Sequence, residues 1–367
     1  MTFKRQCQPI TTRDGAKSLR NSQTWIDFSS NDYLGYSQDT VLLQQLKDTP
    51  FTQFGSTGSR LLGGDYDLTH TLEKNYATFR NKDAALFFNS GYQMNSGLFQ
   101  ALCQKDDLII ADKFAHASLI DGALKSSATL MRYKHNDVAH LEQLLSKHRN
   151  NAGNCWIVSE TLFSMDGDLA PIKDLIKLKK KFNCHLILDD AHGFGALGKD
   201  GVGGISRDQA RDIDLLLATF GKALGSSGAI VACTQEIKDQ LIDQCRAFIF
   251  STALPLPVIQ FNQFALDKLP SDTQKRESLA QLATYFRDQA KALSLPILGT
   301  AHIISLIVGD EAQCKTLEDT LKKSQIWAQS IRTPTVPKGQ ARLRFSLTSA
   351  HTQDMIEHVI KALHDSR

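Results

Sequence analysis

Six short apolar runs, separated by amphipathic stretches, follow one another from about residue 84 of the chain. The runs are apolar throughout rather than alternating, which is typical of strands buried on both faces of a parallel sheet. Between them, apolar residues recur at helical spacing, as at Ile172, Leu175 and Ile176. With right-handed crossovers, this alternation predicts an α/β fold with a mostly parallel, doubly wound sheet over runs 84–88, 108–111, 155–159, 185–188, 215–220 and 228–232.

The two ends of the chain follow other patterns. Near the C-terminus, two expected strands (303–308 and 343–347) alternate with two expected helices (311–324 and from 352 onward). The first 50 residues lack such an alternation and predict an arm with a short helix. We therefore expect an N-terminal arm with a short helix (1–50), a large α/β domain (51–274) and a small C-terminal α+β domain (275–367).

The composition excludes several classes of protein. Hydrophobic residues make up 42% and charged residues 22%, as in ordinary globular proteins, and the net charge of +3 does not indicate nucleic-acid binding. No run approaches the roughly 18 apolar residues of a membrane span, and the N-terminus lacks the apolar segment of a signal peptide. We expect a soluble, cytoplasmic protein with no membrane partner. The seven scattered cysteines contain no C-x-x-C pair, so we expect reduced thiols and no metal site.

Polar residues that directly follow an apolar run are candidate site residues, because ligands of such sheets bind beyond the carboxyl ends of the strands. Gly91 and Tyr92 follow the first run, at a helix start whose backbone N–H groups could bind a phosphate. Asp189 ends a buried run, where a carboxylate needs a partner. Lys222 lies in a glycine-rich turn, where it could form a Schiff base. The acidic loop 160–168 is, on its own, typical of a solvated turn.

Two nucleotide-binding motifs compete with this interpretation. Residues 193–198 match G-x-G-x-x-G, the dinucleotide fingerprint, which should follow its strand directly and open a helix. Here residues 189–192 intervene and the glycine-rich segment 199–204 follows, so a nicotinamide dehydrogenase is a remote alternative. The turn 219–228 lacks the first glycine of a P-loop and has Ala223 at the hydroxyl position, which disfavours a phosphate-hydrolysing enzyme.

One cofactor accounts for the candidate residues together. Pyridoxal 5'-phosphate (PLP) needs a lysine for its aldehyde, a carboxylate that keeps the pyridine nitrogen protonated, and N–H and hydroxyl donors for its phosphate. Asp189 and Lys222 lie one strand-crossover-strand unit apart, so neighbouring strand ends could bring them to one ring. The ordered set, more than any single residue, predicts a PLP site.

The chain resembles the α-oxoamine synthases, which are PLP-dependent transferases of fold type I. The resemblance covers nearly the whole chain, over motifs at 30–35, 58–61, 116–118, 135–137, 164–168, 189–193, 219–222, 251–255 and 333–344. It implies that Lys222 is the Schiff-base lysine and moves the α-proton, that Asp189 pairs with the pyridinium nitrogen, and that His116 stacks on the ring. These three residues are the expected catalytic residues.

The resemblance also assigns the remaining site residues. It implies that His192 contacts the ring hydroxyl and that the phosphate binds to Gly91, Tyr92 and Thr219, with Ser164 lining the same site. For the substrate, it implies that Arg344 binds the amino-acid carboxylate with Asn31 nearby. Positions that contact substrate in the family are matched by His116, Thr335 and Arg5.

Members of this family condense an amino acid with an acyl thioester and release carbon dioxide. The runs 333–337 and 189–192 favour L-alanine and a pimeloyl thioester, with CoA and acyl carrier protein both open as carrier. Alternatives are 5-aminolevulinate synthase, 2-amino-3-oxobutyrate CoA ligase, serine palmitoyltransferase and autoinducer-type synthases. A non-catalytic binding protein is disfavoured because every cofactor position is retained. We also expect a homodimer in which the glycine-rich segment 55–64, with Arg60, reaches the partner's cofactor.

Overall fold

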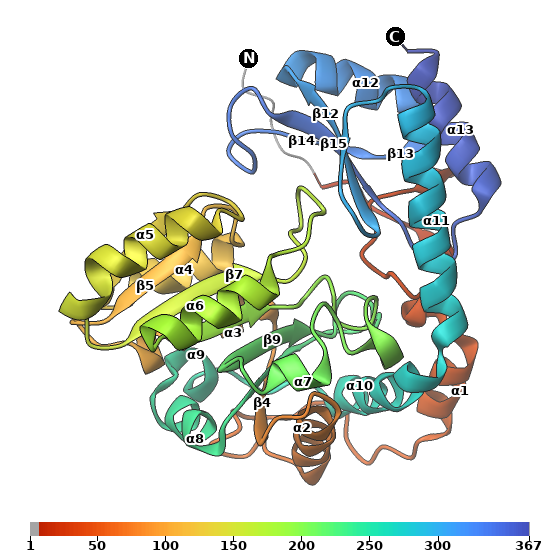
Figure 1. Ribbon diagram of the computed structural model, residues 1–367. Helices are drawn as coiled ribbons and strands as arrows, with labels where there is room; N and C mark the ends of the chain where they lie inside the picture. Colours follow the sequence, from red (N-terminus) through yellow and green to blue (C-terminus); the bar gives the residue numbers. More distant parts are fainter. Residues whose placement is uncertain (1–6, 367) are drawn as a thin grey trace. The chain divides into compact units, whose positions relative to one another are not determined.

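The computed structural model describes residues 7–366 (Figure 1). They form two compact units. The larger unit comprises residues 39–164 and 169–273, and the smaller comprises the described part of 1–38, 165–168 and 274–367. The expected division into an arm and two domains stays a prediction. Within residues 7–366, no helix is both long and apolar enough to cross a membrane.

A seven-stranded sheet forms the centre of the larger unit and confirms the predicted α/β class. Its order is β4-β10-β9-β8-β7-β5-β6, and only β10 runs antiparallel to its neighbours. The strands are β4 (Ala84–Phe88), β5 (Leu108–Asp112), β6 (Thr129–Tyr133), β7 (Cys155–Glu160), β8 (His185–Asp189), β9 (Leu215–Thr219) and β10 (Ala229–Cys233). Only β6 was not predicted, because this edge strand is largely exposed and lacks a continuous apolar run.

Both faces of this sheet are buried. Alternate strand residues such as Leu86 and Val158 pack with helices α3, α4, α8 and α9 in one hydrophobic core, and intervening residues such as Phe87 and Ile157 are buried as well. The helices of this unit are α1 (Thr40–Asp48), α2 (Asp67–Phe79), α3 (Gly91–Leu102), α4 (Ala117–Lys125), α5 (Val138–His148), α6 (Ile172–Phe182), α7 (Arg207–Ala210), α8 (Gln235–Gln244), α9 (Arg246–Ile249) and α10 (Leu256–Lys268).

The smaller unit contains two four-stranded sheets and three helices. One sheet has the order β1-β2-β3-β13 and the other β11-β12-β15-β14. The strands and helices are β1 (Thr12–Asp14), β2 (Lys17–Arg20), β3 (Gln23–Asp27), β11 (Ile297–Leu298), β12 (Ile303–Gly309), β13 (Ile326–Trp327), β14 (Gln329–Ile331), β15 (Ala341–Ser346), α11 (Thr273–Ala292), α12 (Glu311–Lys323) and α13 (Gln353–His364). The predicted strands and helices of this region correspond to β12, α12, β15 and α13.

The N-terminal region contains three strands that were not predicted from the sequence. They form an antiparallel meander in which β2 pairs with both β1 and β3. Asn21 and Ser22, which connect β2 to β3, both have positive φ, as a type I′ hairpin turn requires. The Asp14-Gly15 pair before β2 is a recognised hairpin signal that was missed.

A buried histidine in the smaller unit makes its stability depend on pH. His351 is 4% exposed and stacks on Phe28, and its Nδ1 accepts a hydrogen bond of 3.0 Å from the Thr348 backbone N–H. Burial lowers the pKa of His351 to about 4. In the unfolded chain the pKa of histidine is about 6.5. Between about pH 6.5 and about pH 4, His351 is therefore protonated in the unfolded state but neutral in the folded state.

We therefore expect the free energy of unfolding to fall as pH falls from about 6.5 to about 4, by about 3 kcal/mol from this residue. His351→Asn keeps an acceptor for Thr348 but does not titrate, so its urea unfolding should lose less stability over this range. Equal pH slopes for the two proteins would contradict the assignment.

Candidate active site

One cavity of about 190 Å³ in the larger unit brings together most of the predicted site residues. It is smaller than the roughly 300–1,000 Å³ of pockets for drug-sized ligands and suits a ligand with a single ring. Of the eight predicted cofactor residues, only Ser164 is not among those that line it. The lining residues are Gly91, Tyr92, Met94, Asn95, His116, Ser118, Glu160, Asp189, Ala191, His192, Ala218, Thr219 and Lys222.

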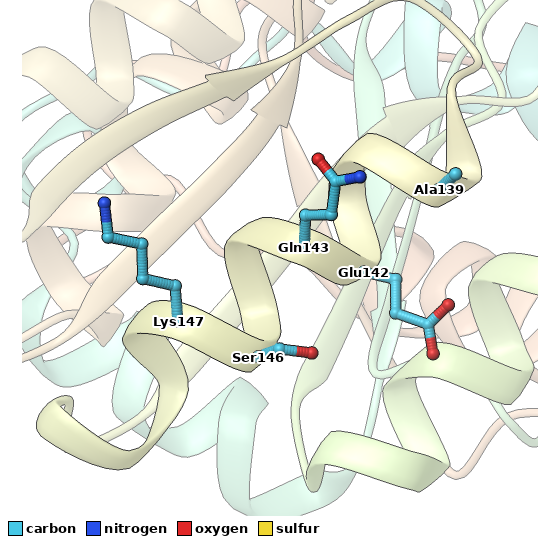
Figure 2. Close-up of a pocket in the computed structure, with 5 residues that line it drawn as sticks. All are labelled: Ala139, Glu142, Gln143, Ser146 and Lys147. Atoms are coloured by element: carbon cyan, nitrogen blue, oxygen red, sulfur yellow. The ribbon is translucent and has the colours of Figure 1, made fainter.

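A wider surface hollow of about 540 Å³ lies on α5 and is not a candidate (Figure 2). It is lined by residues of this one helix, and Figure 2 shows their side chains spread along its surface. Its carboxylate, Glu142, forms an ion pair of 2.6 Å with Lys181 on α6. Three further lysines of α6 are also paired, Lys177 with Asp174, Lys179 with Asp214 and Lys180 with Asp212.

The ends of the parallel strands position the cavity's polar groups. Glu160 is the last residue of β7 and Asp189 the last residue of β8, and the two are paired in register. Thr219 ends β9, and Lys222 lies in the turn that follows. His116 is the N-cap residue of α4, which follows β5. The fold therefore collects residues that are far apart in sequence at one edge of the sheet.

A hydrogen-bond network fixes the carboxylate of Asp189. Its Oδ2 accepts a hydrogen bond of 2.9 Å from the side-chain amide of Asn95, and its Oδ1 accepts one of 3.0 Å from the backbone N–H of Ala191. The same amide of Asn95 donates to Ser118 Oγ at 3.0 Å, and Ser118 Oγ lies 2.7 Å from His116 Nδ1. Asp189 and His116, two of the predicted ring contacts, are thus joined through Asn95 and Ser118.

His116 is held as a neutral imidazole. Its Nδ1 accepts a hydrogen bond from the backbone N–H of Ser118, so the ring proton is on Nε2. Burial within the site lowers the pKa of His116, and the charge of Lys222 lowers it further, against the opposing charge of Asp189. A neutral ring is suited to lie against an aromatic ligand.

The start of α3 offers backbone donors for an anionic group, and Thr219 fixes the turn after β9. Ser90 caps α3 by accepting a hydrogen bond from the Gln93 backbone N–H, and a Cβ placed on Gly91 would meet no atom within 4 Å. The bare backbone at the helix start therefore faces open space. Thr219 Oγ1 donates to the carbonyl oxygen of Gly228 at 3.0 Å, which holds the turn that carries Lys222.

The residues of the cavity fit PLP. A lysine, a fixed carboxylate, a neutral histidine and a helix N-terminus surround a space of suitable size. Two buried oxygens of the wall, Asn95 Oδ1 and Glu160 Oε1, have no hydrogen-bond partner among the described residues. Such atoms are expected where a polar ligand supplies the partner.

The glycine-rich segment after His192 packs around a buried ion pair. Asp190 is fully buried and accepts hydrogen bonds from Arg80 at 2.9 Å and from the backbone N–H of Gly204 at 3.0 Å. A Cβ on Gly203 would lie 1.9 Å from Asp190 Oδ2, and one on Gly193 2.2 Å from Oδ1. The absence of side chains at these glycines leaves room for the Asp190 carboxylate. Because no α-helix begins in the segment 193–204, the segment is not a dinucleotide fingerprint.

Removing Arg80 should destabilise the larger unit. Arg80→Met leaves the Asp190 carboxylate buried without its charged partner, which we expect to cost about 3–5 kcal/mol in the free energy of unfolding. Chemical denaturation measures this loss. The double variant Arg80→Met/Asp190→Asn removes both charges and should recover part of it; a single variant as stable as the wild type would contradict the role of the pair.

Of the predicted substrate residues, His116 lines the cavity of the larger unit, whereas Asn31, Thr335 and Arg344 lie in the smaller unit. Arg344 donates to Asn31 Oδ1 at 3.3 Å, and the hydroxyl of Tyr33 donates to the same oxygen at 3.1 Å. Burial raises the pKa of Tyr33 to about 12, against the opposing charge of Arg344. Thr335 is exposed in the turn before β15. Arg5 lies outside the described residues.

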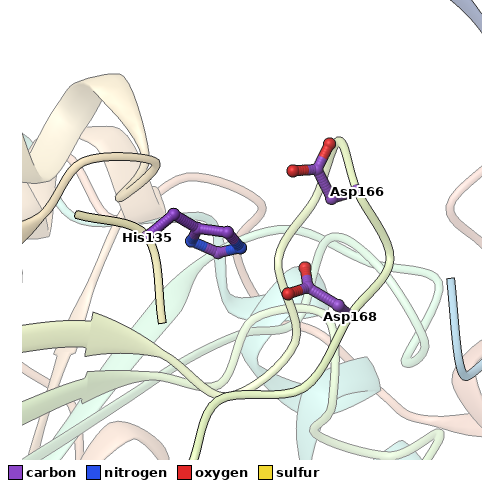
Figure 3. A group of neighbouring side chains, drawn as sticks. All are labelled: His135, Asp166 and Asp168. Carbon is purple, nitrogen blue, oxygen red and sulfur yellow. The ribbon is translucent and has the colours of Figure 1, made fainter. Parts of the chain in front are cut away.

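The loop 165–168 belongs to the smaller unit and carries two carboxylates, Asp166 and Asp168 (Figure 3). Asp166 forms an ion pair with Arg342 of β15, which is 2% exposed. The Oγ of Ser305 on β12 donates to the carbonyl oxygen of Met165 at 2.5 Å. Arg342, which could have been an ordinary surface charge, is therefore a buried anchor of this loop.

Three polar residues that line the cavity, Asn95, Ser118 and Glu160, were not predicted as site residues. Asn95 is the buried polar member of an otherwise apolar face of α3, and that isolation could have identified it. Glu160 ends a buried run in the same way as Asp189, but the sequence analysis treated it as part of a solvated loop. That interpretation was wrong, since residues 160–168 are all buried or half-buried, with Glu160 and Thr161 at 3% and 1% exposure.

Comparisons with known proteins agree with this geometry. A sequence profile of the family described as "Aminotransferase class I and II" matches residues 23–363. An 8-amino-7-oxononanoate synthase from Haemophilus ducreyi is 40% identical over 97% of this chain and 95% of its own.

Two solved structures extend the comparison. The 8-amino-7-oxononanoate synthase from Francisella tularensis is 32% identical, covering 93% of this chain and 97% of its own, with a TM-score of 0.77. A serine palmitoyltransferase variant from S. paucimobilis with a bound PLP-myriocin aldimine is 25% identical, covering 98% and 92%, with a TM-score of 0.93.

Proposed function

The chain belongs to the class I and II aminotransferase family and, within it, to the α-oxoamine synthases, and we propose that it condenses L-alanine with a pimeloyl thioester. The products are 8-amino-7-oxononanoate, carbon dioxide and the free thiol of the carrier. This reaction belongs to biotin biosynthesis. The identity of about 40% to 8-amino-7-oxononanoate synthases over nearly the whole chain supports this choice among the family's reactions.

The observation that carries the proposal is the convergence of Lys222, Asp189 and His116 on one cavity. PLP held at Lys222 supplies an electron sink that stabilises negative charge at the α-carbon of the amino acid. An unrelated cleft would not be expected to combine an amine, a fixed carboxylate and a helix start around a space of this size.

The residues of the chain then have defined tasks. Lys222 removes the α-proton of alanine and later returns a proton to the product. Asp189, held by Asn95 and by the Ala191 backbone, keeps a proton on the pyridine nitrogen. His116, neutral and capped on Ser118, lies against the ring. The backbone of α3 and Thr219 hold the phosphate.

In the smaller unit, Arg344, supported by Asn31, provides a cation for the substrate carboxylate. Thr335 and Arg5 stay predicted substrate contacts. The substrate carboxylate later leaves as carbon dioxide, which breaks a C–C bond at the α-carbon. The new C–C bond to the acyl group forms at the same α-carbon, so one electron sink serves both steps.

The homodimer is part of the proposal. Large apolar side chains of the segment 51–64 and of its neighbour Phe250 are exposed, with Phe54 at 75%, Leu62 at 86% and Phe250 at 69%. Such a patch is typical of a subunit interface. Arg60 does not project from this segment, since it is paired with Asp65 and Glu73 of its own chain.

Light scattering and subunit mixing test the dimer. Leu62→Glu should weaken association, whereas Leu169→Glu, which changes a residue outside the patch that is 46% exposed, serves as the control. If the segment 55–64 completes the partner's site, mixing a Lys222 variant with an inactive variant of this segment should restore part of the activity. An active monomer would refute the proposal.

A panel of substrates tests the reaction. The purified protein with PLP is incubated with alanine, glycine or serine and with pimeloyl, succinyl, acetyl or palmitoyl thioesters, the pimeloyl group on both CoA and acyl carrier protein. We expect turnover with alanine and a pimeloyl thioester, and mass spectrometry should identify 8-amino-7-oxononanoate. Preferential turnover of serine with palmitoyl-CoA, or of glycine with succinyl-CoA, would assign a different member of the family.

A further inference from the structure

A second carboxyl group lies in the cavity beside Asp189, and the proposed chemistry gives it no role. Glu160 ends β7 where Asp189 ends the neighbouring β8, and both line the cavity. The side chain of Glu160 is not exposed to bulk solvent, since the residue is 3% exposed. A carboxyl group in such a position needs hydrogen-bond partners.

The described residues provide only some of the hydrogen-bond partners that the carboxyl group of Glu160 needs. The backbone N–H of His116 donates to the carboxyl group of Glu160. Oε1, however, is buried and has no hydrogen-bond partner among the described residues. An unpaired buried polar atom costs about 1–3 kcal/mol, so one that is retained in a cavity wall indicates that the ligand provides its partner.

The surrounding charges decide which of the two carboxyl groups is ionised. Glu160 faces Asp189 on β8, Asp112 at the end of β5, Lys222 after β9 and the His116 backbone. Burial raises the pKa of Glu160 well above its ordinary value, and the charge of Asp189 raises it further, against the opposing charge of Lys222. Two carboxylates at adjacent strand ends repel each other, so one of them retains its proton.

Hydrogen bonding identifies Asp189 as the ionised member. Its two oxygens accept from the Asn95 amide and the Ala191 backbone, which stabilises a negative charge. Glu160 receives fewer donors and therefore keeps its proton, as expected where neighbouring acids lie in different environments. It thus offers an O–H donor for which the described residues provide no acceptor.

We propose that Glu160 is a cofactor-binding residue, which donates a hydrogen bond as a neutral carboxylic acid to the 3-oxygen of the PLP ring. This inference rests on the proposed function, because it requires PLP in this cavity. The 3-oxygen is identified as the acceptor because the other polar groups of PLP already have partners. The phosphate binds at α3 and Thr219, the pyridine nitrogen carries the proton held by Asp189, and the aldehyde carbon joins Lys222. The ring oxygen has a second lone pair for His192.

Two substitutions separate a neutral donor from an anion. Glu160→Gln keeps an oxygen for the His116 N–H and supplies an amide donor, but it cannot ionise. Glu160→Met has similar length and no donor. Gln263→Met is the matched control, since Gln263 is 6% exposed, has an unpartnered Oε1 and does not line the cavity.

The experiment measures the dissociation constant of PLP and the visible absorbance of the bound cofactor against pH, without substrate. For Glu160→Met we expect a roughly tenfold weaker affinity. We also expect the pH midpoint of the absorbance change to rise by about one unit, because a ring oxygen that loses a donor holds a neighbouring proton more tightly. Glu160→Gln and Gln263→Met should resemble the wild type.

Each other result overturns the inference. If Met and Gln at position 160 both leave affinity and spectrum unchanged, Glu160 does not contact the cofactor. If both lose affinity equally, the carboxyl group acts as an anion. If changes arise only after alanine or the thioester is added, its acceptor is on the substrate. A wild-type protein that binds no PLP would instead refute the proposed function itself.

Discussion

Lys222→Ala should lose at least about 10⁴-fold in kcat for the condensation of alanine with a pimeloyl thioester. The variant lacks both the amine that joins the cofactor and the group that moves the α-proton, and positioned acid–base catalysis alone typically contributes about 10²–10⁴-fold. Steady-state assays with saturating PLP measure the effect. The fold should persist, because Lys222 is only partly buried in a turn.

Lys199→Ala provides the matched control for this variant. Lys199 is an exposed lysine at the start of a short 3-10 helix (Lys199–Gly201) of the same unit and does not line the cavity. We expect its turnover to match the wild type. An active Lys222→Ala enzyme, or an inactive Lys199→Ala enzyme, would contradict the assignment of the reactive amine.

Asp189→Asn should bind PLP yet lose about a thousandfold in kcat, which corresponds to about 4 kcal/mol. The amide is nearly isosteric with the carboxylate but cannot hold a proton on the pyridine nitrogen, so the electron sink is weakened. Turnover of a cofactor-loaded variant measures the loss, and absorbance verifies the loading. Near-normal turnover in that form would remove Asp189 from its role.

The neighbouring carboxylate offers an internal comparison. Asp190→Asn changes a residue that is fully buried against Arg80 and the glycine-rich segment and does not line the cavity. Its main effect should be on the free energy of unfolding. Two substitutions of the same kind at adjacent positions therefore separate the chemical role from the structural role.

The central sheet was predictable because burial on both faces makes each of its core strands a continuous apolar run. Residues 84–88 coincide with β4, four other predicted runs differ from their strands by one residue at one end, and the run 228–232 is shifted by one residue from β10. The edge strand β6 was not predictable in this way, since only Tyr133 of its five residues is buried. A run of apolar residues indicates a buried strand, so this pattern cannot predict a strand that is mostly exposed.

The site was predictable where a residue's sequence position determined its location. Asp189, Thr219 and Lys222 end strands or follow them directly, and the fold brings them together as expected. Asn95 is different, because its contact with Asp189 joins the interior of a helix to a strand end and depends on how α3 packs on the sheet. Such packing cannot be deduced from spacing in a single sequence.

Chemical trapping of the cofactor tests the central claim most directly. The protein is loaded with PLP and reduced with borohydride, which fixes the cofactor to the amine it has joined, and the digested protein is analysed by mass spectrometry. The account predicts a single pyridoxyl-modified peptide with the modification on Lys222. Modification of a different lysine, or a reduced protein without any pyridoxyl group, would contradict it.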